Sequence, residues 1–137
     1  MTIVLGASMA VAWLFDDERT AAAHRIMFSV LRDGAVVPSL WRLEVGNVLQ
    51  NAARRGRCDE AYVDRSLSRL SRLPISIDPD TDERAWGTTL ALAREQGLTL
   101  YDAAYLELAV RSGFSLASCD AALVAAAARK RVTVLTA

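Results

Sequence analysis

The sequence is poor in the residues that build covalent or metal-bound frameworks. It has two cysteines, Cys58 and Cys119, and one histidine in 137 residues. The cysteines lie far apart in sequence and form no Cys-x-x-Cys pair, which excludes a zinc site and a disulfide scaffold. Such sparse thiols are typical of a reducing compartment, so we expect a cytoplasmic location.

Charge of one sign is also missing, because 16 Lys and Arg residues balance 16 Asp and Glu residues. A neutral total excludes a strongly basic nucleic-acid arm or an acidic tail, although charge can still be segregated locally. No apolar run reaches the ~18 residues of a membrane span, and the apolar N-terminus lacks the basic segment of a signal peptide. We expect no membrane partner.

Glycine-rich phosphate-binding motifs are absent as well. The sequence contains neither GxGxxG nor GxxxxGK[ST], which argues against a nucleotide-binding α/β domain. Apolar residues make up 53% of the chain and charged residues 23%, enough to bury a core. We find no repeat or linker and predict one domain over residues 1–137.

Short apolar segments alternate with longer amphipathic ones. The predicted strands span residues 3–5, 35–37, 75–77, 114–117 and 132–135. The predicted helices span residues 7–15, 17–32, 40–55, 59–73, 80–96, 99–111 and 121–130. This alternation predicts an α/β fold with a parallel sheet covered by helices on both faces. Sites in such sheets gather at the carboxyl ends of the strands.

Polar residues at the predicted helix starts suggest how the helices begin. Asp17 and Glu18 suit the first turn of the second helix, where carboxylates complement the helix dipole. Ser39 is a candidate cap for the third helix.

The apolar positions of two helices predict which faces are buried. On the third helix the predicted core stripe is Trp41, Val45, Val48 and Ala52. On the helix over residues 99–111, Leu106 and Ala109 face the core, whereas Glu107 and Arg111 mark the solvent side.

Two acids on predicted helices stand in apolar surroundings. Glu44 shares a helix face with Asn47, one turn away. The alternative for Glu44 is a solvated glutamate at the helix edge. Asp102 heads an apolar stripe, where a carboxylate is costly without a partner. The alternative for Asp102 is a capping box with Thr99.

A third acid, Asp120, follows a predicted strand and begins a helix, two residues after Ser118. Its alternative role is a helix N-cap. Clustered carboxylates raise one another's pKa unless a cation lies among them, and Mg²⁺ or Mn²⁺ is the natural partner of such oxygens. The three acids together therefore suggest metal-assisted hydrolysis.

Four segments of the chain carry a family resemblance. They are IVLGAS at the start, VPSLWRLEVGNVL around Glu44, LTLYDAAYLELA around Asp102 and LASCDAAL around Asp120. Together they resemble the PIN-domain ribonucleases, most closely the VapC-like toxins of toxin–antitoxin pairs. The resemblance implies a three-layer α/β/α sandwich with a parallel sheet of about five strands.

The resemblance also implies an activity and partners. It implies a Mg²⁺- or Mn²⁺-dependent endoribonuclease toxin that cleaves RNA, is neutralised by a cognate antitoxin protein, and forms a homodimer. Glu44, Asp102 and Asp120 fall on three of the family's catalytic, metal-binding acids. Supporting polar positions are Ser8, Asn47 and Ser118.

One family acid is missing. The first strand in the family ends as V-L-D-A-S, whereas here Gly6 stands in place of the aspartate. Because one metal ligand is lost, we expect weak or absent metal binding and impaired catalysis. Gly6 is either natural or a change that inactivates a toxic nuclease and is selected during cloning, and the source gene decides between them. The alternative function is a non-catalytic PIN-fold module that binds RNA or protein.

Two further features suggest contacts with partners. Arg54, Arg55 and Arg57 are candidate RNA-phosphate contacts, the alternative being a solvated helix end. In the family, the first two helices help to form the antitoxin groove. Here those helices carry Met9, Trp13, Phe15, Ile26, Met27 and Phe28, for which ordinary core packing is the alternative.

Overall fold

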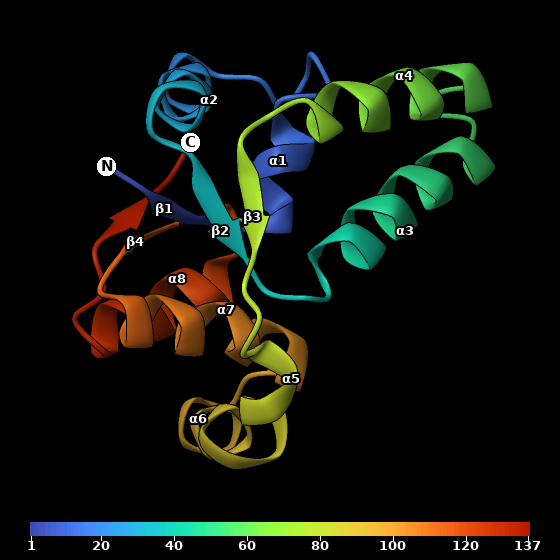
Figure 1. The fold of residues 1–137 in the computed structure, drawn as a ribbon. Coiled ribbons are helices and arrows are strands. Elements are labelled where there is room, and N and C mark those ends of the chain that lie inside the picture. The colour runs from blue at the N-terminus through green and yellow to red at the C-terminus, as the bar shows by residue number, and fades with distance from the viewer.

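Five short parallel strands form the centre of the computed structural model, which describes residues 1–137 (Figure 1). They are β1 (Ile3–Leu5), β2 (Ala35–Val37), β3 (Ile75–Ile77), β4 (Ser115–Ala117) and β5 (Val134–Leu135). Their spatial order is β3-β2-β1-β4-β5, and every neighbouring pair is parallel. The predicted five-stranded parallel sheet is confirmed.

Helices occupy every connection between strands. The connections contain α1 (Ala7–Ala12) and α2 (Ala21–Asp33), α3 (Trp41–Arg54) and α4 (Glu60–Ser71), α5 (Thr81–Arg84), the π-helical turn η1 (Ala85–Thr89), α6 (Leu90–Gln96) and α7 (Leu100–Ser112), and α8 (Ala121–Arg129). In Figure 1, α3 and α4 form a hairpin that projects beside the sheet. None of the helices is both long enough and apolar enough to cross a membrane.

The order of the strands explains the three layers. The chain steps from β1 to β2 to β3 toward one edge, then crosses to β4 and β5 on the other side of β1. Because such crossovers are right-handed, the reversal of direction places the later helices on the opposite face from the earlier ones. The reversal lies between β1 and β4, where an open α/β sheet forms its binding crevice.

Burial of α7 on nearly all sides fixes its place. Residues 103–109 of this helix are buried without a break. The helix contacts β1 and β4 on one side and α6 and α8 on others. A helix surrounded in this way needs apolar or small side chains all round, as the YDAAYLELA segment supplies. It also holds Asp102 at a constant position beside the sheet.

The predicted start of the second helix was wrong. Helix α2 begins at Ala21, and Thr20 is its N-cap, accepting a hydrogen bond from the Ala23 amide at 3.0 Å. Asp17 and Glu18 therefore lie before the helix and do not form its first turn. Both pair instead with an arginine distant in the sequence, which no local pattern reveals.

The predicted cap of α3 was also wrong. Leu40 is the N-cap residue and makes no side-chain capping bond. The Ser39 hydroxyl instead donates to Asp82 Oδ1 at 2.7 Å, which connects the start of α3 to α5. The helix predicted over residues 80–96 exists but is interrupted at Gly87, whose φ of −106° and ψ of −105° are not helical.

The predicted core stripe of α3 was wrong at one position. Trp41, Val45 and Ala52 are buried as expected, but the Val48 side chain is 41% exposed. Leu49, four residues after Val45, is fully buried and takes its place. The stripe therefore runs on the i, i+4 row, and Val48 is displaced toward the face that carries Glu44.

Candidate active site

The carboxyl ends of β1 and β4 meet at Gly6. This residue follows Leu5 with φ −69° and ψ 148°, an extended conformation open to any residue, so no positive φ requires glycine. Its amide donates to the Ala117 carbonyl oxygen at 2.8 Å. A Cβ at position 6 would lie 2.7 Å from that oxygen, closer than such atoms approach in proteins. The close strand ends thus give a steric reason for glycine that the sequence did not reveal.

Two predicted supporting serines fix the turn after β4. The fully buried Ser118 hydroxyl accepts a hydrogen bond from the Asp120 amide at 3.1 Å. Ser8, at the start of α1, accepts one from the Cys119 amide at 2.9 Å, and the two hydroxyl oxygens lie 3.4 Å apart. This pair joins the segments after β1 and β4 and sets the position of Asp120.

Asp120 is both a cap and a site carboxylate. Its Oδ1 accepts a hydrogen bond from the Leu123 amide at 2.9 Å, which confirms the N-cap role on α8. The residue is exposed. Capping fixes the carboxylate and occupies one oxygen, so the other remains available to a ligand.

Asp102 lies in the first turn of α7, half-buried. Thr99 caps this helix, its hydroxyl accepting from the Asp102 amide at 3.1 Å. Burial and the neighbouring charge of Asp120 raise the pKa of Asp102, and a hydrogen bond with Thr99 acts in the opposite direction. The predicted capping arrangement thus coexists with proximity to a second acid.

Glu44 on α3 points toward the same place. The buried Tyr105 hydroxyl, from α7, donates to Glu44 Oε1 at 3.2 Å. Burial raises the pKa of Glu44 and the charges of Asp102 and Asp120 raise it further, whereas the bond from Tyr105 lowers it. Burial and Glu44 in turn raise the pKa of Tyr105, so its hydroxyl keeps its proton at neutral pH.

The structure therefore brings together the acids of three distant segments. The charges of Asp102 and Asp120 raise the pKa of Glu44, and the charge of Asp120 raises that of Asp102, so the three acids lie near one another. Asn47, the remaining predicted supporter, is exposed and makes no side-chain hydrogen bond to these acids. The site has no carboxylate at position 6.

Whether these acids suit a divalent ion depends on how many ligands the protein must supply. No three His, Cys, Asp or Glu side chains lie close enough to hold a metal ion by themselves. Mg²⁺, however, is usually bound by one or two carboxylates together with water and substrate phosphate. The donor chemistry therefore fits a hard divalent ion of that kind and does not fit an all-protein cage.

Comparison with known proteins identifies the family. The model of the PIN domain matches residues 3–130 of this chain. The chain belongs to the PIN-domain family. Two curated relatives come from Pyrobaculum aerophilum. One, named Exonuclease VapC9, is 37% identical over 120 residues, 85% of this chain and 86% of the relative. The other, named Ribonuclease VapC3, is 30% identical over 120 residues, 88% of this chain and 90% of the relative.

Solved structures share the fold of this PIN domain. The crystal structure of PAE2754 from Pyrobaculum aerophilum has a TM-score of 0.72 and 32% identity, covering 98% of this chain and 84% of its own. The structure of VapBC2 from Rickettsia felis bound to a promoter DNA fragment has a TM-score of 0.66 and 12% identity, covering 100% and 99%. The VapC-like resemblance and the three-layer fold are confirmed.

Tyr105 is a site residue of this PIN domain that the sequence interpretation missed. It lies three residues after Asp102 in the buried part of α7 and reads as a core aromatic. A usable signal was present, because a buried tyrosine hydroxyl needs a hydrogen-bond partner. Its partner, Glu44, lies 61 positions away in the sequence, so only the three-dimensional structure shows that the two residues are hydrogen-bonded.

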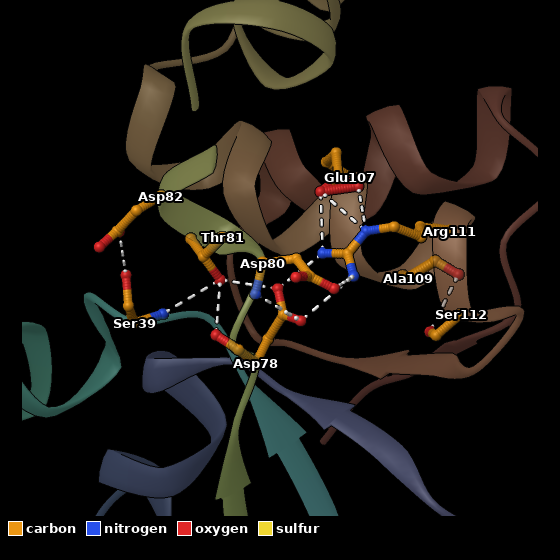
Figure 2. Close-up of polar contacts among 9 residues, drawn as sticks. All are labelled: Ser39, Asp78, Asp80, Thr81, Asp82, Glu107, Ala109, Arg111 and Ser112. Carbon is orange, nitrogen blue, oxygen red and sulfur yellow. Dashed lines mark hydrogen bonds and ion pairs between the residues drawn. The ribbon is translucent and has the colours of Figure 1, made fainter. Parts of the chain in front are cut away.

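A second charged cluster of the PIN domain corrects the prediction for α7. Figure 2 shows the Arg111 guanidinium between Glu107 and Asp78. Its Nε lies 2.8 Å from Glu107 Oε2, and one terminal nitrogen lies 2.6 Å from Asp78 Oδ2. Glu107 and Asp78 are each only 5% exposed. Glu107 and Arg111 were predicted to face solvent. This was wrong because both belong to an ion-pair cluster with the buried Asp78, which lies just after β3.

This buried cluster anchors the end of β3 to α7. The Thr81 hydroxyl donates to Asp78 Oδ2 at 2.8 Å, and Asp80 lies 3.8 Å from Arg111 (Figure 2). Burial raises the pKa of Asp78, but the hydrogen bonds from Arg111 and Thr81 outweigh it and leave that pKa below its usual value. The three carboxylates of the cluster share the Arg111 guanidinium, which connects the end of β3 to α7.

The three predicted RNA-binding arginines differ in their surroundings. Arg54 and Arg55 are exposed at the end of α3. Arg57 donates to Asp17 Oδ1 and Glu18 Oε2, each at 2.7 Å. Its guanidinium also lies 3.8 Å from the centre of the Phe15 ring. Arg57 therefore already has partners within the chain.

The apolar residues considered for an antitoxin groove mostly belong to the core. Met9, Trp13, Phe15 and Ile26 are buried. Phe28 is 60% exposed. For the four buried residues, the alternative of ordinary core packing is confirmed.

Proposed function

We propose that this PIN domain is a Mg²⁺- or Mn²⁺-dependent endoribonuclease toxin of the VapC type, impaired in this chain by Gly6. The observation that carries the proposal is the convergence of Glu44, Asp102 and Asp120 from separate segments, with the pKa of the first two raised. Neighbouring acids with raised pKa values are typical of functional sites. The printed names of the two curated relatives, an exonuclease and a ribonuclease, support nuclease chemistry.

The residues of the site have different roles in this proposal. Asp102 and Asp120 would hold the divalent ion, which when bound supplies positive charge and polarises a phosphoryl oxygen. The half-buried Glu44 suits the role of general base, because its raised pKa favours accepting a proton from water. Tyr105 orients Glu44 through a hydrogen bond to Oε1 and remains protonated. Gly6 supplies no carboxylate, so the ion would bind weakly.

Cleavage of end-labelled RNA with Mn²⁺ tests this proposal. We expect little cleavage by the chain itself and clear cleavage by Gly6→Asp, which restores the missing acid. Internal fragments from both labels indicate an endonuclease, whereas stepwise loss of terminal nucleotides indicates an exonuclease. Asp102→Asn in the Gly6→Asp background should abolish cleavage. No cleavage by Gly6→Asp on a broad set of structured RNAs would remove the main support for the proposal.

The partners in this proposal are a cognate antitoxin and a second copy of the chain. The Rickettsia felis structure of similar fold is described as VapBC2 on its promoter DNA, which supports a paired partner. Light scattering of the purified chain tests the homodimer. Rescue of cell growth by a neighbouring small gene, in cells expressing Gly6→Asp, tests the antitoxin.

A non-catalytic module is the second candidate, favoured by one observation. The Ala117 carbonyl oxygen occupies the space that a side chain at position 6 would need. A chain adapted to glycine there would keep the fold and bind RNA without a divalent ion. RNA binding that is unchanged by a chelator, together with an inactive Gly6→Asp variant, favours this candidate.

A further inference from the structure

A hollow that contains two arginines lies at the end of α3, beyond the acidic site. It has a volume of about 240 Å³ and is lined by Val48, Asn51, Ala52, Arg55 and Arg57. The lining contains two guanidinium groups and one amide but no carboxylate. A lining of this composition suits an anion, because guanidinium groups and amide N–H donors bind phosphate oxygens.

The hollow lies on the same helix row as Glu44. Asn51 follows Glu44 by seven residues and Arg55 follows by eleven, spacings that return to one face of an α-helix. Both lie on α3 or its C-cap, so the rise from Glu44 to Arg55 is roughly 16 Å. A strand of RNA cleaved beside Glu44 can reach the hollow with a neighbouring backbone phosphate a few nucleotides away.

No ion pair within the protein explains the position of the Arg55 side chain. It is exposed and takes part in none of the ion pairs of the structure. The last carbonyls of α3 already accept backbone hydrogen bonds, from Gly56 to Ala53 at 3.1 Å and from Arg57 to Ala52 at 2.9 Å. Gly56, with φ 75°, makes this closure possible. Arg55 is therefore available to an outside ligand.

The second guanidinium of the hollow is fixed. Arg57 pairs with Asp17 and Glu18 and stacks on Phe15, so its position is set and two carboxylates offset its charge. The uncompensated charge in the hollow is that of Arg55. Arg54, the neighbouring arginine, does not line the hollow and projects roughly 100° away around the helix.

We propose that this hollow is a phosphate subsite for single-stranded RNA, with Arg55 as its ionic contact and Asn51 as a hydrogen-bond donor. This inference rests on the proposed function, in which Glu44 on the same helix row, together with Asp102 and Asp120, acts on a phosphodiester. RNA is favoured over an acidic peptide because Glu44, Asn51 and Arg55 form one continuous row from the acidic site to the hollow.

Fluorescence anisotropy with labelled oligouridylates, one dinucleotide and one longer oligomer, tests the subsite in a chelating buffer that prevents cleavage. The long oligomer should bind Arg55→Ala about tenfold more weakly than the parent chain, the loss expected for one charge-assisted contact. The slope of log K against log salt should fall by about 0.7, the value for one phosphate on a single strand. The dinucleotide, too short to span both positions, should bind both proteins equally.

Two further variants make the test specific. Arg42→Ala removes the same charge from an exposed position on the opposite side of α3 and should change the affinity less than about twofold. Asn51→Asp places a carboxylate in the hollow and should weaken the long oligomer through repulsion. Circular dichroism confirms that each variant is folded.

Several results overturn the subsite. They are equal losses in Arg42→Ala and Arg55→Ala, no loss in either, or no RNA binding by the parent chain. If Arg55→Ala binds RNA normally but loses affinity for hexaglutamate, the hollow serves an acidic protein partner instead. Because binding is read without cleavage, an inactive Gly6→Asp variant refutes the nuclease proposal alone. In that case, a loss of RNA affinity specific to Arg55→Ala would still support the phosphate subsite.

Discussion

The Gly6 amide donates to the Ala117 carbonyl oxygen at 2.8 Å, and a Cβ on Gly6 would lie 2.7 Å from the same atom. The strand ends that form the crevice are thus closed around a residue without a side chain. An aspartate restored at position 6 would have to displace the end of β4 before its carboxylate could act. Gly6→Ala therefore tests the steric effect of a side chain at position 6, and comparison of Gly6→Asp with Gly6→Ala tests the effect of the carboxylate.

Gly6→Ala should lower the free energy of unfolding. Crowding against the Ala117 oxygen destabilises the folded state by about 1–3 kcal/mol. Alanine also reduces the backbone entropy of the unfolded chain, which stabilises the protein by about 0.5–1 kcal/mol. We expect a net loss near 1 kcal/mol by urea denaturation. Gly46→Ala is the matched control, since nothing lies within 4 Å of a Cβ there and its helical position favours alanine. A Gly6→Ala variant as stable as the parent would contradict the crowding.

Tyr105→Phe should raise the pKa of Glu44 further and lower stability by about 1–2 kcal/mol. The change removes the one hydrogen bond that stabilises the Glu44 carboxylate against burial. A carboxyl-detected NMR titration measures the pKa, and urea denaturation measures stability. Tyr101→Phe is the control, because the Tyr101 side chain is 68% exposed. Equal titration of Glu44 in parent and Tyr105→Phe would show that the hydroxyl does not set its charge.

Glu44→Gln should stabilise the protein at neutral pH. Burial and two neighbouring acids raise the folded-state pKa of Glu44, so its ionised form opposes folding above that pKa. As pH falls, Glu44 takes up a proton in the folded state first and the parent recovers this loss. The stability difference between the variant and the parent should therefore be positive at about pH 7 and shrink toward about pH 4. A stability difference between Glu44→Gln and the parent that does not change with pH would contradict a raised pKa of Glu44 in the folded state.

Arg111→Ala should destabilise the protein by about 3 kcal/mol, because Asp78 and Glu107 would remain buried without a cation. The lowered pKa of Asp78 supplies stability that is present above its ordinary pKa and is lost as pH falls through the lowered value. The gap between parent and variant should therefore narrow in acid. Arg94→Ala, at an exposed position, should change stability by less than about 0.5 kcal/mol. A loss of similar size in both variants would refute a specific role for the buried cluster.

Most of the fold follows from local signals in the sequence. Short segments of mainly apolar residues, bounded by glycine or proline, predicted β1, β2 and β3 at their observed bounds. Thr99 caps α7 as its position suggested, and the helix predicted from residue 59 is capped there by Asp59. These features succeed because a cap or a buried strand depends on residues a few positions apart. Ser39 failed as a predicted cap because its partner, Asp82, lies on another element.

The candidate site was only partly predictable for the same reason. Acids at strand ends and in apolar helices identified Glu44, Asp102 and Asp120, which the fold brings near one another. The pairing of Tyr105 with Glu44 joins residues 61 positions apart, and that of Arg111 with Asp78 joins residues 33 apart. Such contacts have no local pattern and follow only from the crossing of α7 over the sheet.

Binding of Mn²⁺ measured by calorimetry on the parent chain, Gly6→Ala and Gly6→Asp tests the central claim most directly. The claim is that Asp102 and Asp120, beside Glu44, form a divalent-ion site limited by the missing carboxylate at position 6. We predict weak binding by the parent and by Gly6→Ala, and at least about tenfold tighter binding by Gly6→Asp. Affinity for Mn²⁺ in Gly6→Asp no greater than in Gly6→Ala, or tight binding by the parent itself, would contradict the account.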